Sequence, residues 1–230
     1  MQIFYDSEKT KEIQQRMIDY WEKTKQERGT ELHAYDIANC EMKAFCRLTG
    51  LKPVWTNQVA GMMIFGIIGG LTIQMTYPED QREWAGDLEK LVFCHIDVFE
   101  NKEVPLEVKT TRKRLFRKDT IPDAWINQIL TYMVITKKRK GHLIFFNALS
   151  TAISVWTIVI SEEGLQCFQL YILEKANRIK ECATSGNYTP LKVSPEQYSG
   201  CSYKKDCAKR DECKKAYAEL KKAGKVDDDK

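Results

Sequence analysis

The stretch from Cys94 to Arg112, CHIDVFENKEVPLEVKTTR, constrains this chain most, because it combines two short apolar strands with charged residues at fixed spacing. It predicts a β-hairpin with strands at 95–99 and 105–110, joined by a polar turn. Residues at i and i+2 of a strand face the same side. Glu107 and Lys109 are therefore expected to share one face of the second strand.

The length of the turn decides where Asp97 of the first strand lies. A three-residue connection centred on Lys102 places Asp97 opposite Glu107, whereas a two-residue turn pairs Asp97 with Leu106 and puts the two acids on opposite faces. We predict the first register, since it brings two carboxylates and an ammonium together. Two carboxylates suit a hard cation such as Mg²⁺, and Lys109 would then meet an anion or an activated water.

Composition leaves the partner open. The chain has 230 residues, 43% of them hydrophobic, which is enough for one domain with a sizeable core. Its net charge of +4 is modest, so nucleic acid, another polyanion and no charged partner all remain possible. The polar start of the chain has no signal-peptide pattern, and we expect a cytoplasmic protein without a membrane partner.

The first part of the chain predicts helices. Residues 6–28 have the pattern of an exposed amphipathic helix, and Asp36 is a candidate N-cap for the next helix. The apolar segment Val59–Met75 has seventeen residues, at the lower end of the roughly 17–25 that a spanning helix needs. Because it contains four glycines and lacks flanking positive charge, a buried core helix is the better interpretation.

Further elements are expected on both sides of the hairpin. Before it come a polar break at 76–86 and a strand at 88–94. After it come a helix at 121–136 capped by Asp119 or Thr120, strands at 142–146 and 152–160, a helix at 161–182 and a short helix near 212–222. On the helix at 121–136, Gln128 and Tyr132 are four apart and share a face. This order predicts an α/β fold with a central mixed β-sheet flanked by helices.

Cysteines gather near the end of the chain. Cys201, Cys207 and Cys213 are separated by two five-residue gaps in a polar, lysine-rich segment. Clustered cysteines in an intracellular chain favour a metal over disulfides, although this spacing alone does not name the metal. A fourth ligand from Cys40 or Cys46 would join the two ends of the chain.

Positive charge follows the hairpin directly. The basic residues of this loop are Arg112, Lys113, Arg114, Arg117 and Lys118. Beside a cation site they suit the phosphate backbone of DNA, whereas by themselves they would serve solubility. His95 shares a strand face with Asp97 and is a candidate to line the site.

Taken together, these residues resemble the PD-(D/E)XK nuclease superfamily, and more narrowly the RecB-type iron–sulfur nucleases that include the CRISPR-associated exonucleases of spacer acquisition. The resemblance is carried by HID at 95–97, PLEVKTTR at 105–112, QILTY at 128–132, IANCEMKAFCR at 37–47 and the late cysteines. It covers roughly residues 33–213. It implies a restriction-endonuclease-like fold with an iron–sulfur cluster joining the N- and C-terminal segments.

The resemblance also implies roles for single residues. Asp97, Glu107 and the Val108 carbonyl would bind Mg²⁺ or Mn²⁺, and Lys109 would position or activate the attacking water. Gln128 and Tyr132 would hold the site and the DNA strand. A structural [4Fe–4S] cluster would be bound by Cys40, Cys201, Cys207 and Cys213.

The implied function is a metal-dependent DNA nuclease, an exonuclease on single-stranded or frayed DNA ends. Its setting would be CRISPR spacer acquisition in antiviral defence, with the CRISPR integrase complex as partner, or DNA repair. The expected organisation is an N-terminal helical region (1–87), a nuclease core (88–183), a cysteine segment (184–223) and a disordered tail (224–230). The alternatives are a DNA-binding or assembly subunit with a degenerate site, and a zinc-stabilised binding module.

Two departures from the family pattern bear on activity. Members usually carry a histidine in a G-x-x-H motif before the strands, but here the stretch is GIIGG, with Gly69 or Gly70 at that place. Water, His95 or an acid from 79–89 such as Asp87 would then take over the metal. The common late spacing C-x2-C-x5-C also has Tyr198 in its first cysteine position, so Cys213 is the replacement ligand and Cys46 the second choice.

Overall fold

The computed structural model describes residues 31–55, 57–111, 121–147, 149–199, 201–203 and 205–224, together with 8–9, 12–13, 15–16 and 19. Five basic residues predicted to contact DNA lie outside this part of the chain: Arg112, Lys113, Arg114, Arg117 and Lys118. So do most of the amphipathic helix expected at 6–28 and the end of the acidic tail.

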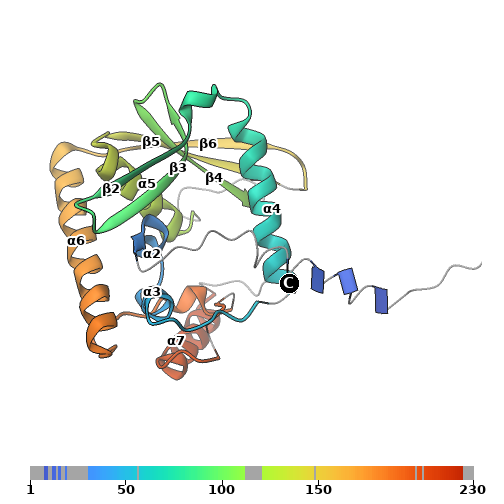
Figure 1. The fold of residues 1–230 in the computed structure, drawn as a ribbon, viewed down its shortest axis with the longest axis vertical. Helices are drawn as coiled ribbons and strands as arrows, with labels where there is room; N and C mark the ends of the chain where they lie inside the picture. Colours follow the sequence, from blue (N-terminus) through green and yellow to red (C-terminus); the bar gives the residue numbers. More distant parts are fainter. Residues whose placement is uncertain are drawn as a thin grey trace, which may run out of the picture.

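A mixed sheet forms the centre of the molecule (Figure 1). Its strands are β1 (Leu32–His33), β2 (Arg82–Leu88), β3 (Val92–Glu100), β4 (Val104–Thr111), β5 (Lys140–Asn147) and β6 (Ile153–Val159). Their order is β1-β3-β4-β5-β6, with β2 paired to β3. The β1–β3 and β4–β5 pairs are parallel and the other pairs antiparallel, which confirms the predicted mixed sheet.

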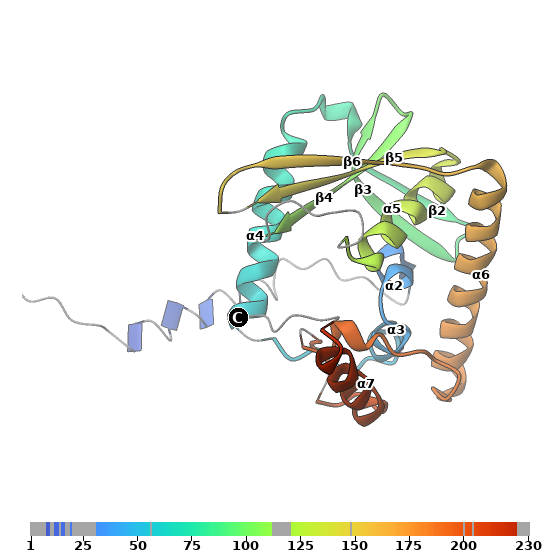
Figure 2. The ribbon, with the colours of Figure 1, turned by 180° about the vertical axis from the view of Figure 1, so that it is seen from behind.

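Helices flank this sheet, as Figures 1 and 2 show from opposite sides. They are α2 (Ala34–Ala38), α3 (Glu41–Leu48), α4 (Asn57–Gln74), α5 (Asp123–Thr136), α6 (Glu162–Ser185) and α7 (Arg210–Lys222). Helices α2, α5 and α6 share the largest apolar core, which includes Ile37, Ile129 and Ile172. Helix α4 packs on β4 through a separate, smaller core around Ile73.

Local sequence signals set several of these boundaries. Ser161 caps α6 by accepting a hydrogen bond from the Gly164 N–H at 3.1 Å, and Gly186 ends that helix in a left-handed conformation. The buried apolar residues of α6 recur at helical spacing, so that one face of the helix packs on the core. The predicted helices at 121–136, 161–182 and 212–222 and the two later strands are confirmed within a few residues.

Two predicted boundaries are wrong. The segment expected as a polar break, 76–86, holds most of β2. Among the described strands β2 pairs with β3 alone, and every second side chain along it is exposed, which is where polar residues are tolerated. The helix expected to begin at Asp36 is two helices, broken at Asn39 and Cys40. Asp36 is not an N-cap: it lies inside α2 and accepts a hydrogen bond from the His33 N–H at 2.9 Å.

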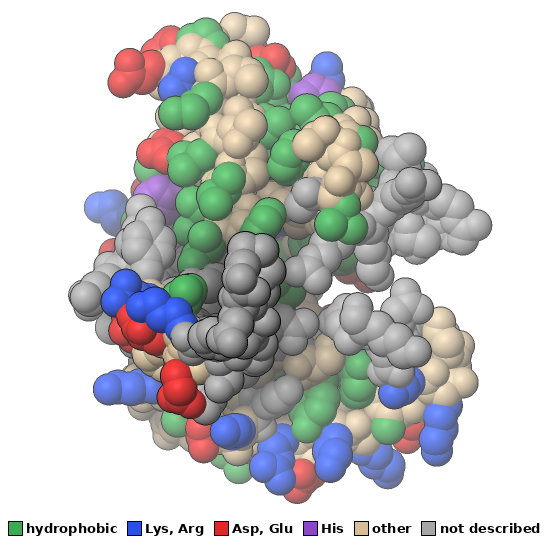
Figure 3. All heavy atoms as spheres, turned by 90° about the vertical axis from the view of Figure 1, so that its right-hand side faces the viewer, with side chains coloured by type: hydrophobic (Ala, Val, Ile, Leu, Met, Phe, Trp, Pro, Cys, Tyr) green, Lys and Arg blue, Asp and Glu red, His purple; other side chains and the backbone are tan. Residues whose placement is uncertain are grey.

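The expectation of a buried core helix at Val59–Met75 is also wrong. Only the C-terminal half of α4 reaches the sheet, and large apolar side chains along it are exposed, among them Phe65, Ile68 and Leu71. Figure 3 views this side of the molecule and shows hydrophobic side chains gathered over α4. Among the described residues, no helix, α4 included, combines the length and apolar content that crossing a bilayer requires.

Helix α4 approaches β4 most closely at Gly69. A Cβ atom there would lie 2.1 Å from Thr110 Oγ1 and 3.1 Å from Phe146 Cδ1, whereas a Cβ at Gly70 would meet nothing within 4 Å. The close approach therefore requires glycine at 69 and not at 70. It also explains why no histidine stands at 69, since a side chain there would collide with the sheet.

This geometry predicts opposite effects for two neighbouring substitutions. Gly69→Ala should lower the free energy of unfolding by about 1–3 kcal/mol, because β4 or α4 must shift to admit the methyl group. Gly70→Ala should raise it by roughly 0.5–1 kcal/mol, because alanine loses less backbone entropy in a helix. Urea unfolding of the two variants measures both, and equal effects would contradict the close approach at Gly69.

Candidate active site

The hairpin register is the predicted one. Strands β3 and β4 pair through Val98 with Leu106, Phe99 with Pro105 and Glu100 with Val104, and residues 101–103 form the connection. The connection is thus three residues centred on Lys102. Continuing this register by one residue brings Asp97 opposite Glu107.

At Asp97 the sheet opens. Asp97 is paired in neither the β2–β3 nor the β3–β4 ladder, and Glu83, at the corresponding place on β2, has a positive φ of 51°. The Val108 N–H, which the continued ladder would pair with β3, instead donates to Asp97 Oδ2 at 2.8 Å. The interrupted pairing leaves the carboxylate between two strands rather than on a regular sheet surface.

A closed set of hydrogen bonds joins β4 to α5. Lys109 Nζ donates to Glu107 Oε1 at 2.5 Å and to Gln128 Oε1 at 2.8 Å. Gln128 Nε2 donates to the Tyr132 hydroxyl at 2.7 Å, and that hydroxyl donates to Glu107. Each of the four side chains makes two hydrogen bonds within the ring, which holds Glu107 and Lys109 in one arrangement.

Burial and like charge dominate the electrostatics of this site. Burial and the nearby Glu107 carboxylate raise the pKa of Asp97 to about 7, although the Val108 N–H partly offsets both effects. Burial and the two carboxylates also raise the pKa of Tyr132 well above its usual value, so its hydroxyl remains a donor. Two adjacent carboxylates, one of them reluctant to ionise, favour a cation between them.

The metal-binding capacity of this site is limited. In the part of the chain that the structure describes, no three His, Cys, Asp or Glu side chains are arranged to hold one metal ion. A cation at the hairpin would have Asp97 and Glu107 as carboxylate ligands and complete its coordination with a backbone carbonyl such as that of Val108 and with water. Mg²⁺ usually keeps several waters in this way.

Gln74 is the site residue that the sequence interpretation missed. It is the last residue of α4, is buried, and donates from Nε2 to Asp97 Oδ1 at 3.2 Å. The available signal was a polar side chain in the last turn of an otherwise apolar helix. Helix α4 therefore does contribute a polar group to the carboxylates, but one turn beyond the glycines at which a histidine was expected.

The other candidates for that role lie elsewhere. Asp87 accepts a hydrogen bond from the Lys90 N–H at 2.7 Å and so stabilises the turn between β2 and β3. His95 is exposed and stacks on His33, with ring centroids 5.9 Å apart. Asp87 and His95 are thus engaged elsewhere, and α4 supplies Gln74 to Asp97.

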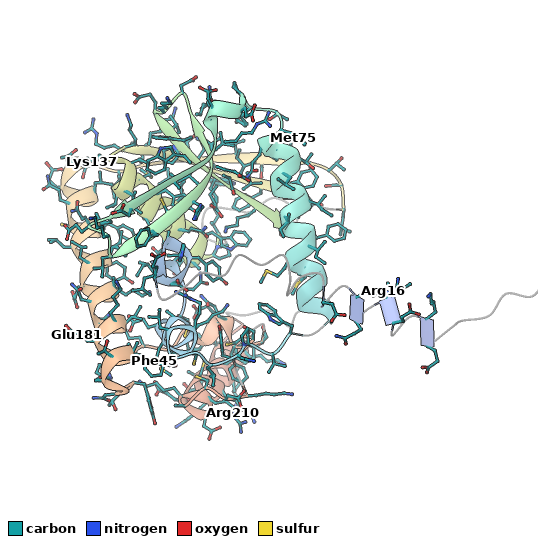
Figure 4. The ribbon with its side chains drawn as sticks, in the orientation of Figure 1. Arg16, Phe45, Met75, Lys137, Glu181 and Arg210 are labelled. Carbon is teal, nitrogen blue, oxygen red and sulfur yellow. The ribbon has the colours of Figure 1, made fainter. Side chains whose placement is uncertain are left out.

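A second candidate site lies where the two ends of the described chain meet. Cys40, Cys201, Cys207 and Cys213 line a single cavity, together with Lys43, Arg210 and Tyr198 among others. Cys40 lies directly before α3 and Cys213 on α7, and both views of the ribbon place these helices side by side (Figures 1 and 2). Figure 4 shows Phe45 of α3 and Arg210 of α7 in this same lower part of the molecule.

Cys46 is placed differently from these four cysteines. It is buried, does not line the cavity, and forms a side-chain hydrogen bond with Cys207. That bond and the neighbouring Lys209 lower the pKa of Cys207 to about 6, while burial raises the pKa of Cys213 to about 12. Burial also raises the pKa of Cys40, so the thiolate form is favoured at Cys207, which Cys46 contacts directly.

The donor set of this cavity fits an iron–sulfur cluster. A [4Fe–4S] cluster takes one cysteine at each of four irons, so its ligands line a cavity rather than converge on one point. Four cysteines around one cavity match this arrangement.

Comparison with known proteins identifies the fold. The sequence matches no protein-family model and no curated protein. The crystal structure of SSO0001 superposes with a TM-score of 0.56 at 13% identity, covering 87% of this chain and 96% of that one. An alkaline exonuclease from Laribacter hongkongensis, LHK-Exo, gives 0.52 at 11% identity over 73% of this chain and 95% of that one.

A second structure of LHK-Exo, in complex with dAMP, gives a TM-score of 0.52 at 12% identity over 68% of this chain and 91% of that one. The chain therefore shares the fold of these solved structures, a central mixed sheet flanked by helices. The likeness does not single out the CRISPR-associated family.

Proposed function

We propose that this protein is a metal-dependent nuclease acting on DNA. The observation that carries the proposal is the arrangement at the hairpin: Asp97 opposite Glu107, with Lys109 held between Glu107 and Gln128. The nuclease-like fold supports it independently. A fold of this type does not by itself specify a reaction, so the proposal rests on the side chains at the hairpin.

Each residue has a role that follows from its contacts. Asp97, Glu107 and the Val108 carbonyl would hold Mg²⁺ or Mn²⁺, which when bound polarises a phosphodiester and lowers the pKa of a water. Lys109 directs its ammonium towards the water and the phosphate, a position that Gln128 fixes. Tyr132 holds Glu107 through its hydroxyl, and Gln74 and the Val108 N–H orient Asp97.

We propose that the substrate is DNA with a single-stranded or frayed end, and that the protein cuts it as an exonuclease. One similar structure binds dAMP, the kind of product that an exonuclease releases. The basic residues after the hairpin would contact the phosphate backbone. A place in CRISPR spacer acquisition, with an integrase complex as partner, stays a narrower hypothesis that rests on the sequence resemblance.

We also propose that Cys40, Cys201, Cys207 and Cys213 bind a [4Fe–4S] cluster with a structural role. The cavity that these four residues line joins segments about 160 residues apart. Lys43 and Arg210 at the same cavity suit a group with negative charge, as a cluster with four thiolates has.

The test of the nuclease proposal compares cleavage by two proteins. An end-labelled DNA single strand is incubated with Mg²⁺ or Mn²⁺ and either the wild type or Lys109→Ala. Since a positioned acid–base group contributes about 10²–10⁴-fold, the variant should be at least about 100-fold slower. EDTA should stop the wild type.

The alternative, a DNA-binding or assembly subunit with a degenerate site, makes a different prediction for the same samples. It binds the labelled strand in a gel-shift assay with the same affinity in both proteins and cuts it in neither. If the wild type cleaves the strand no faster than Lys109→Ala does, the nuclease proposal is rejected.

A further inference from the structure

Cys40 lies in the short break between α2 and α3, and the ends of that break are held from α6. Lys175 of α6 donates from Nζ to the Ile37 carbonyl at 2.6 Å and to the Asn39 carbonyl at 3.0 Å. The lysine is only 6% exposed. A buried ammonium is costly unless it is fully hydrogen-bonded, so these two carbonyls are held at a defined distance from α6.

The residue after Cys40 is held from the same helix. Glu41, 3% exposed, accepts hydrogen bonds from Arg178 Nη2 at 2.7 Å and Nε at 3.3 Å. Lys175 and Arg178 are three residues apart and therefore lie on one face of α6. The residues before and after Cys40 in the sequence are therefore both held from α6. We call Glu41, Lys175 and Arg178 the buried ion cluster.

The buried ion cluster also reaches the segment that carries the other cysteines. The Lys192 N–H donates to Glu41 Oε2 at 2.8 Å, and Cys40 Sγ contacts the Lys192 carbonyl at 3.9 Å. Lys209, two residues after Cys207, donates from Nζ to the Leu191 carbonyl at 2.6 Å. Residues 189–192 therefore connect Glu41 to the cysteine segment.

A gain in folding stability does not by itself explain why these charged residues are buried. Buried ion pairs are often no more stabilising than apolar residues of the same volume, but they fix geometry. We propose that Lys175 and Glu41 are positioning residues that hold Cys40 in place to ligate the group in the cysteine cavity. This inference rests on the proposed cluster, and it concerns how the ligand set is preorganised before the cluster binds.

The test measures how firmly iron is held in folded protein. Lys175→Met keeps the aliphatic stem and removes both hydrogen bonds, while Lys175→Arg keeps the charge. The control is Glu174→Gln, which removes the exposed partner of the same Arg178. After anaerobic reconstitution, we measure iron and sulfide per chain and the rate at which a chelator removes iron, at a temperature where circular dichroism shows every protein folded.

Residues that support metal ligands typically change metal affinity 10- to 100-fold. Lys175→Met and Glu41→Gln should therefore release iron about 10-fold faster than the wild type or more, Lys175→Arg should recover part of that loss, and Glu174→Gln should match the wild type. Release at the wild-type rate by both Lys175→Met and Glu41→Gln would overturn the inference.

If Lys175→Met does not fold, the milder Glu41→Gln decides alone by the same criterion. A wild type that takes up no iron and sulfide would instead reject the proposed cluster itself. The two failures are therefore distinguishable.

Discussion

Replacing Asp97 by Asn should strongly slow metal-dependent cleavage and, in the absence of metal, stabilise the protein above neutral pH. Removing one of two carboxylate ligands should slow cleavage on the order of 10³-fold, because charge stabilisation of the transition state is lost. The stability effect has a separate cause, the raised pKa of about 7 at Asp97.

The sign of that effect follows from proton binding. The Asp97 pKa is about 7 in the folded protein against a model value of 3.8. Between these values the folded state keeps a proton that the unfolded state has lost, so the stability of the metal-free protein falls as pH rises from about 4 to about 7. A shift of this size corresponds to roughly 2–4 kcal/mol, towards the lower end because Asp97 keeps some contact with solvent.

Urea unfolding in EDTA at pH 5 and pH 8 measures this difference. The wild type should lose stability between the two pH values relative to Asp97→Asn, which cannot ionise. Added Mg²⁺ should stabilise the wild type more at pH 8 than at pH 6, because binding requires the carboxylate. If the unfolding free energies of the wild type and of Asp97→Asn change with pH in parallel, the pKa of Asp97 is not raised in the folded protein.

Loss of the proposed cluster gives the second large effect. Cys213→Ser should lose most of its iron and sulfide together with the brown absorbance, since it removes one of four ligands lining the cavity. Cys46→Ser should keep them, because Cys46 does not line the cavity and instead bonds to the Cys207 side chain. Metal analysis of the two purified variants, side by side with the wild type, distinguishes the two cysteines.

The opposite outcome is equally informative. If Cys213→Ser keeps its full cluster and Cys46→Ser loses it, the ligand set is Cys46 with the remaining three. Zinc in place of iron and sulfide in the wild type would favour the zinc-stabilised module instead.

The two strands of the hairpin could be predicted because their determinants are local. The alternation of side chains places Glu107 and Lys109 on one face, but the sequence left the turn length open between two and three residues. The structure has the three-residue connection, which sets Asp97 against Glu107. Helical spacing likewise placed Gln128 and Tyr132 on one face of α5, and the structure brings that face to Lys109 and Glu107.

The predictions that failed involve distant partners. Gln74 was missed because its contact with Asp97 depends on how far α4 runs along the sheet, which Gly69 sets by its fit against Thr110. Strand β2 was missed because only Trp84 and Leu88 mark its inner face with large apolar side chains, and its pairing with β3 shows it to be a strand.

The sequence by itself determined the chemistry of this protein: two acids and a lysine at hairpin spacing, and cysteines at both ends of a mixed α/β chain. Only the tertiary structure decided how those groups are used. It opened the sheet at Asp97, supplied Gln74 from α4, and brought Cys40 to the cysteines of the C-terminal segment, with Cys46 bonded to Cys207. The physical reason is that residue spacing encodes local geometry, whereas burial and contacts between segments arise only when the whole chain packs.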